Sequence, residues 1–158
     1  MQKPITGIAH CGFRTTKFEE MLQFYGEILE VPRHFDLPYT AERLAAMGET
    51  PFQPGDVWIT EFRVGERQFL EIFNVPYTQK EAGKAVSFAE ISLEVEDIEE
   101  AARKLEAKGV TLWDGSRDTG KPIVGPYQKT LLPGGFYGFH VQDPEGNEVQ
   151  LIQYETTN

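Results

Sequence analysis

The residues of this chain that could do chemistry are single polar side chains among apolar ones, at matching places in two similar halves of the sequence. His10 and Glu90 each lie in an apolar stretch that precedes an acidic helix start. Glu71 and Gln150 each lie in an apolar stretch near the end of a half. An imidazole nitrogen, two carboxylates and an amide oxygen suit a transition metal ion. If the halves face each other about a pseudo-twofold axis, we expect these four side chains to meet at one ion.

Two of these four side chains are carboxylates in apolar surroundings. Strand alternation places Glu71 on the same face as Phe69 and Phe73, where removing its charge from water is costly unless it is paired or metal-bound. Glu71 and Glu90 would repel each other unless a cation lay between them or one took a proton. Considered alone, each of these residues would more often have a structural role than serve as a metal ligand. Their joint placement at matching positions favours a metal site.

Each half is predicted to contain a strand, a helix and then three strands. The first half has expected strands over 5–13, 33–37, 55–64 and 67–74, and helices over 16–29 and 41–47. The second has expected strands over 86–95, 110–113, 136–142 and 148–154, with one helix between Asp97 and Gly109. Thr16 and Asp97 are the expected N-cap residues, each followed three positions later by a glutamate. The glycine- and proline-rich segment 119–135 is expected to be a loop that closes over the site.

Composition limits the class of protein. The chain has 158 residues, 40% of them hydrophobic, which is enough for one domain or two small modules that share a core. A net charge of −10 argues against nucleic acid and against an anionic membrane as partners. A single cysteine, Cys11, excludes an internal disulfide, and no apolar run is long enough to span a membrane. We therefore expect a cytoplasmic protein that binds a small molecule.

The whole pattern resembles a known family, the vicinal-oxygen-chelate superfamily, which includes glyoxalase I, the extradiol dioxygenases and the bleomycin-resistance proteins. The resemblance covers nearly the whole chain, in order. It rests on these stretches: His10-Cys11-Gly12-Phe13, Phe24-Tyr25-Gly26-Glu27-Ile28-Leu29, Phe69-Leu70-Glu71-Ile72, Leu93-Glu94-Val95-Glu96-Asp97-Ile98 and Asp143-Pro144-Glu145-Gly146-Asn147. It implies an α+β fold of paired βαβββ modules, whose curved mixed sheets surround a cavity. The expected modules are 1–75 and 86–158, joined by a linker over 76–85.

The resemblance also implies a ligand set. Metal-binding members take their ligands from the first and last strand of each module, which here gives His10, Glu71, Glu90 and Gln150. The second module departs from the usual pattern, since Glu90 stands where a histidine is common and Gln150 where a glutamate is common. The composition of the set nevertheless equals that of the zinc-dependent form of glyoxalase I. Zn²⁺ is the first choice, with Ni²⁺, Mn²⁺ or Fe²⁺ as alternatives.

The activity that the resemblance implies is that of a metal-dependent lyase or isomerase, acting on a small carbonyl-containing substrate through an enediolate or enolate. Glu90 is the first choice for the catalytic base and Glu71 the second. The substrate cavity is expected to be lined by aromatic residues: Trp58, Phe62, Phe69, Phe73, Phe88 and Tyr127. His34 and His140 are expected to be surface or strand residues without a role.

Two alternatives remain open at this point. A protein of the same fold could bind or sequester a small molecule without catalysis, because fold alone does not fix function. The resemblance to glyoxalase I also implies a homodimer, in which the site could lie within one chain or be shared between two.

Overall fold

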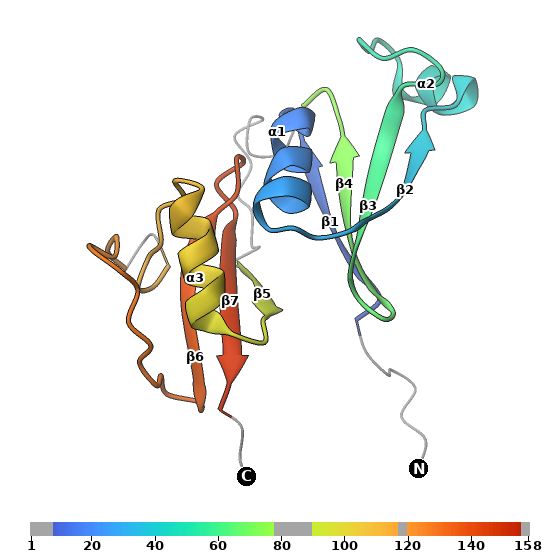
Figure 1. Ribbon diagram of the computed structural model, residues 1–158. Coiled ribbons are helices and arrows are strands. Elements are labelled where there is room, and N and C mark those ends of the chain that lie inside the picture. The colour runs from blue at the N-terminus through green and yellow to red at the C-terminus, as the bar shows by residue number, and fades with distance from the viewer. Residues whose placement is uncertain (1–7, 78–89, 117–119, 156–158) are drawn as a thin grey trace, which may run out of the picture. The chain divides into compact units, whose positions relative to one another are not determined.

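The chain folds into two compact units, and each unit carries a helix against one face of a mixed sheet (Figure 1). The computed structural model describes residues 8–77, 90–116 and 120–155, and the units are Met1–Val86 and Ser87–Asn158. This architecture confirms the predicted α+β fold class. The predicted linker 76–85 lies mostly outside the described residues, so the module boundaries stay predictions. Among the described helices, none is long and apolar enough to cross a membrane.

The first unit contains a four-stranded sheet in the order β1-β4-β3-β2, with β1 parallel to β4 and the other pairs antiparallel. Its strands are β1 (His10–Thr15), β2 (Arg33–Pro38), β3 (Val57–Gly65) and β4 (Gln68–Asn74). Its helices are α1 (Phe18–Leu22), which continues as the π-helix η1 (Gln23–Ile28), and α2 (Ala41–Met47). The predicted order of strands and helices is confirmed, although η1 winds more widely than the α-helix expected there.

Alternation along the strands gives this sheet two distinct faces. Phe13, Phe62, Leu70 and Ile72 share the face that α1 and η1 cover, and all four are almost fully buried. Tyr25 of η1 packs here, with its ring centroid 6.0 Å from that of Phe13 and 6.5 Å from that of Phe62. We call the other side, which the helix of the same unit does not cover, the open face. The apolar core thus fixes which side chains are left for the open face.

The second unit repeats this arrangement with fewer regular strands. Its sheet has the order β5-β7-β6, with β5 (Glu90–Glu94) parallel to β7 (Glu148–Tyr154), and β6 (Phe136–Gln142) antiparallel to β7. The helix α3 (Ile98–Ala107) buries Ile98, Ala102 and Leu105. The strand predicted over 110–113 is reduced to a bridge in which Trp113 pairs with His140 of β6. Within the part of the chain that is described, this bridge takes the place that β2 has in the first unit.

The two helix starts differ in how well they were predicted. The Asp97 side chain accepts hydrogen bonds from the backbone N–H groups of Glu99 and Glu100, which confirms it as the N-cap of α3. The helix stops as predicted, with Gly109 at φ 78° just past its end. The prediction for Thr16 was wrong, because α1 starts at Phe18 and its N-cap, Lys17, makes no side-chain cap hydrogen bond. The hydroxyl of Thr15 instead accepts from the backbone N–H of Lys17.

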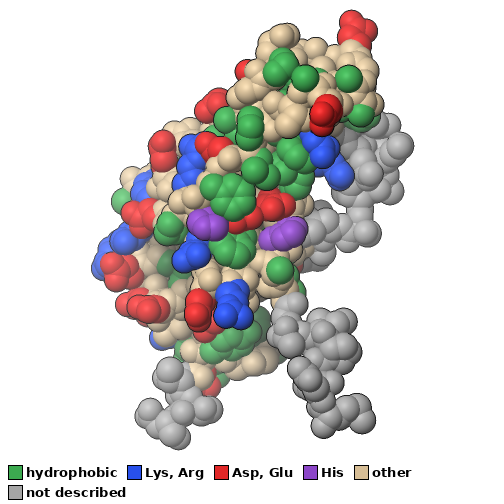
Figure 2. Space-filling view, turned by 90° about the vertical axis from the view of Figure 1, so that its right-hand side faces the viewer, with side chains coloured by type: hydrophobic (Ala, Val, Ile, Leu, Met, Phe, Trp, Pro, Cys, Tyr) green, Lys and Arg blue, Asp and Glu red, His purple; other side chains and the backbone are tan. Residues whose placement is uncertain are grey.

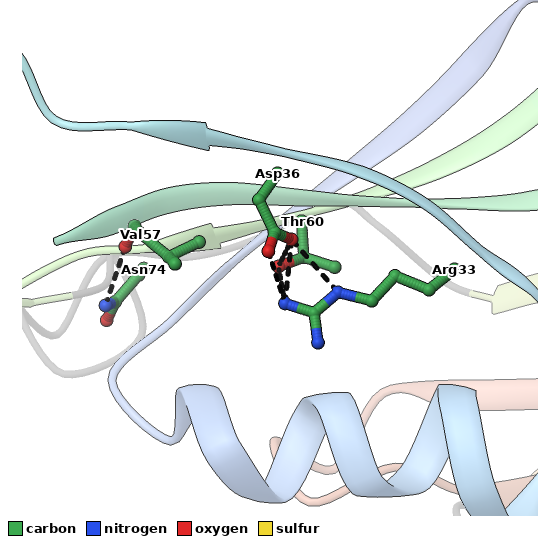
Figure 3. Close-up of polar contacts among 5 residues, drawn as sticks. All are labelled: Arg33, Asp36, Val57, Thr60 and Asn74. Atoms are coloured by element: carbon green, nitrogen blue, oxygen red, sulfur yellow. Dashed lines mark hydrogen bonds and ion pairs between the residues drawn. The ribbon is translucent and has the colours of Figure 1, made fainter. Parts of the chain in front are cut away.

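A β-bulge in β2 changes the direction of side chains at the edge of the first sheet. Arg33 pairs with Phe62 and Phe35 with the next residue of β3, so His34 is an extra residue between them. The bulge lets Arg33 and Asp36 meet on the same side, where Arg33 donates hydrogen bonds of 2.7–3.0 Å to the Asp36 carboxylate (Figure 3). The fully buried Thr60 joins them by donating to Asp36 Oδ1 over 2.8 Å. These hydrogen bonds hold the bulged part of β2 against β3.

Replacing Thr60 by valine should test this network, because the change removes the hydroxyl and keeps the side-chain shape. Losing the 2.8 Å hydrogen bond to Asp36 and the longer 3.4 Å one from Arg33 should lower the free energy of unfolding by about 1–2 kcal/mol. Equilibrium denaturation would measure the loss against Thr111→Val, which alters an exposed threonine outside the network. Equal stabilities of the two variants would show that the Thr60 hydroxyl contributes nothing to the stability of the fold.

Candidate functional site

The open face of the first unit carries a row of four polar side chains, one from each strand. His10 of β1 lies with its Nε2 3.5 Å from Glu71 Oε2 of β4. Glu71 is directly opposite Glu61 of β3 in the antiparallel register. Glu61 Oε1 in turn lies 2.8 Å from His34 Nδ1 of β2. Figure 2 shows such a mixture of histidine, acidic and apolar side chains gathered on one face.

The centre of this row is a pair of carboxyl groups. Glu61 is only 7% exposed and lies directly opposite Glu71 in the register of β3 and β4. Burial raises the pKa of the Glu71 carboxyl, the contact with Glu61 raises it further, and His10 opposes the shift. Two ionised carboxyl groups on opposing positions repel each other, and either a proton or a cation at Glu71 would relieve this repulsion.

The second unit builds a matching row from different residues. Glu90 of β5 and His140 of β6 are joined by a hydrogen bond of 2.8 Å between Oε2 and Nε2. Gln150 of β7 lies opposite both Ser92 and His140, and its Oε1 accepts a 2.6 Å hydrogen bond from the Ser92 hydroxyl. His140 is 9% exposed, whereas the Glu90 side chain is 41% exposed. This row therefore contains a buried imidazole beside an accessible carboxylate.

The registers make the two rows correspond. Gly12 opposes Glu71 in β1–β4, as Ser92 opposes Gln150 in β5–β7, so His10 and Glu90 take equivalent positions. The structure thus brings His10 together with Glu71 inside one unit. Glu90 and Gln150 lie on the neighbouring strands β5 and β7 of the other unit, one on each.

The donor chemistry of these residues fits a divalent transition metal. His10 and Glu71 offer an imidazole nitrogen and a carboxylate, and Glu90 and Gln150 offer a carboxylate and an amide oxygen, which are common metal ligands. Within the described residues, no three side chains of His, Cys, Asp or Glu form a group that could hold a metal ion. Of the four predicted ligands, each unit by itself contributes two.

The predicted aromatic lining divides between different environments. Phe69 lies on the open face, where its ring stacks on His34 with centroids 5.1 Å apart. Phe73 shares that face and contacts Trp58, whose ring is also covered by the Arg43 guanidinium at 3.5 Å. The two other described residues are Phe62 and Tyr127. Phe62 is buried against η1, and Tyr127 packs on the buried Phe139 and bonds through its backbone N–H to Glu106 of α3. Phe88 lies outside the described residues.

Sequence reasoning missed three members of the rows: Glu61, His34 and His140. One signal was available for Glu61, a charged residue between Thr60 and Phe62 in a strand that is otherwise mostly apolar. His140 has the same character in β6, between Phe139 and Val141. No local signal pointed to His34, because the bulge that brings it next to Glu61 depends on the register between β2 and β3.

Comparisons with known proteins agree with this arrangement. The model of the Glyoxalase/Bleomycin resistance protein/Dioxygenase superfamily matches residues 7–151. No curated protein matches the sequence. Among solved structures, TnmS3, an antibiotic binding protein from Streptomyces sp. CB03234, is 17% identical with a TM-score of 0.62, over 98% of this chain and 100% of that one.

Two further solved structures show the same fold. Lactoylglutathione lyase from Agrobacterium tumefaciens is 17% identical with a TM-score of 0.59, over 96% of each chain. A member of the same superfamily from Sphaerobacter thermophilus is 20% identical with a TM-score of 0.59, over 94% of this chain and 98% of that one. With the family match over most of the sequence, these observations show that the chain belongs to the Glyoxalase/Bleomycin resistance protein/Dioxygenase superfamily.

Proposed function

We propose that this protein is a metal-dependent lyase or isomerase of the vicinal-oxygen-chelate type that acts on a small carbonyl-containing substrate. The observation that carries the proposal is the pairing of His10 with Glu71, an imidazole and a carboxylate 3.5 Å apart on the open face. Glu90 and Gln150, at the equivalent strand positions, would complete the ligand set. A divalent ion bound there supplies Lewis-acid polarisation of a substrate carbonyl. Zn²⁺ remains the first choice of metal and a glyoxalase I-like reaction the first choice of chemistry.

The protein's own part in the reaction is proton transfer at the carbon next to the substrate carbonyl. A displaced or weakly bound carboxylate ligand takes the proton from that carbon, and the protonated carboxyl returns it to the former carbonyl carbon, as an isomerisation through an enediolate requires. Glu90 is the proposed base, because its side chain is accessible and His140 fixes its orientation. Glu71 is the alternative base, since burial raises the pKa of its carboxyl and so favours a group that can hold and return a proton.

A second candidate function is binding of a small molecule without catalysis. The stacked rings of His34 and Phe69 present a flat aromatic surface beside the polar row, and Arg63 lies 5.6 Å from the Phe69 ring centroid. Such a surface suits a planar aromatic ligand. The similarity to an antibiotic binding protein supports this candidate as well. Screening hemithioacetals, acyl thioesters and aromatic diols, with and without added metal, separates the two functions.

Metal content is the direct test of the proposed enzyme. Protein purified without a chelator should contain close to one divalent ion per site by elemental analysis, and His10→Ala and Glu71→Ala should each lower that content strongly. Loss of even an outer partner of a metal ligand costs about 10–100-fold in affinity, so loss of a ligand should cost at least as much. Glu66→Ala is the matched control, because Glu66 is an exposed glutamate in the turn between β3 and β4. Full metal content in both ligand variants would exclude this site.

The oligomeric state gives a second test. We predict a homodimer in which His10 and Glu71 of one chain serve the same ion as Glu90 and Gln150 of the other. A His10→Ala variant and a Glu90→Ala variant would then each lack both sites, whereas their heterodimer would regain one intact site. Subunit exchange followed by metal analysis measures this recovery. Heterodimers that form but bind no metal would assign the ligand set to a single chain.

A further inference from the structure

In each unit, the strand that pairs antiparallel with the last strand (β3 or β6) places a polar residue directly beside the proposed donor of that last strand. Glu61 of β3 opposes Glu71, and His140 of β6 opposes Gln150. The two residues differ in type, but they take equivalent positions in the two sheets, and both are buried, at 7% and 9% exposure. Because a buried polar side chain occurs at the same place in both units, we infer that the two side chains have the same role.

Glu61 is held from two sides. On one side it lies directly opposite Glu71 in the β3–β4 register, and on the other its Oε1 lies 2.8 Å from His34 Nδ1. His34 is itself fixed, because the bulge in β2 turns it to this face and its ring stacks on Phe69. A carboxyl group bonded to His34 in this way keeps one orientation, and from its place beside Glu71 it restricts the Glu71 carboxyl to the side of His10.

His140 of the second unit is also held in place by hydrogen bonds, through both its backbone and its side chain. Its backbone exchanges two hydrogen bonds with Trp113, of 2.8 and 2.9 Å. Its Nε2 bonds to Glu90 Oε2 over 2.8 Å. The imidazole is thus fixed to the sheet and fixes in turn the more exposed Glu90 side chain, which would otherwise sample several rotamers.

We propose that Glu61 and His140 are positioning residues of the metal site, Glu61 holding Glu71 and His140 holding Glu90. The proposal rests on the proposed function, because it takes Glu71 and Glu90 as ligands. Partners that orient a ligand raise metal affinity by removing its freedom to turn away. Neither positioning residue contacts the ion in this scheme, so each should be replaceable by a neutral side chain that makes the same hydrogen bond.

The test compares a matched pair of variants at each position by metal affinity. Glu61→Gln keeps a group that donates to Glu71 and accepts from His34, whereas Glu61→Leu makes neither bond. His140→Gln keeps a donor for Glu90, whereas His140→Leu does not. Competition with a chromophoric chelator for Zn²⁺ and Co²⁺ should show Kd values raised about 10–100-fold in the leucine variants. The glutamine variants should stay within about threefold of the unmodified protein, as should the Glu66→Gln control.

Metal-free crystal structures give an independent measurement. In Glu61→Leu the Glu71 carboxylate should turn away from His10, and in Glu61→Gln it should stay. If Glu61→Leu does not fold, His34→Leu takes its place, since it removes the other support of Glu61 from an edge strand. Its Kd should rise, and its Glu71 carboxylate should also turn away.

The outcomes separate this inference from the proposed function. Unchanged Kd in the leucine variants of a protein that binds metal would overturn the positioning roles and leave the proposed function standing. A glutamine variant as weak as His10→Ala would make that residue a ligand, which also overturns the inference. No metal binding by the unmodified protein would reject the proposed function. The positioning roles would then be judged by whether the metal-free structures show Glu71 displaced.

Discussion

The arrangement of the first unit depends on one electrostatic constraint, the placement of two carboxyl groups on neighbouring strands. Glu61 and Glu71 face each other across β3 and β4, and Glu61 is almost fully buried. Removing two such groups from water is unfavourable unless protons, hydrogen bonds or cations compensate. His10 and His34 stand at the two ends of the pair and supply part of this compensation. Across the four strands the order is therefore His–Glu–Glu–His, so that each carboxyl group has a histidine beside it.

The second unit meets the same constraint with another distribution of charge. The residue of β6 at this place is an imidazole, His140, and its partner on the last strand is the neutral Gln150, so the pair equivalent to Glu61 and Glu71 contains no carboxyl group. Glu90 takes the place that His10 has in the first unit. Histidine and glutamate have thus exchanged strands between the units while each row keeps a histidine–carboxylate contact. The fold sets the positions of the polar residues, and the side-chain types are redistributed among them.

Much of this arrangement could be predicted from the sequence, because the relevant signals are local. Strand alternation gave the faces of β4 and β7, and it separated Glu71 from Leu70 and Ile72. The bounds of α2, β6 and β7 were also predicted correctly, because the signals that set them lie within each segment. The partners of Glu71 were not predictable in this way. Glu61 and His34 become its neighbours only through the pairing of strands distant in sequence, and for His34 also through a bulge that one sequence does not reveal.

The parallel pairing of the first and last strands of each unit has a consequence for synthesis of the chain. β1 is an edge strand whose neighbour in the sheet, β4, follows it only after every other element of the unit. β5 depends in the same way on β7, the final strand of the second unit. Contacts between residues so distant in sequence form slowly, and unpaired strand edges favour aggregation. On the ribosome, each unit must therefore hold its first strand without a partner until its last strand has emerged.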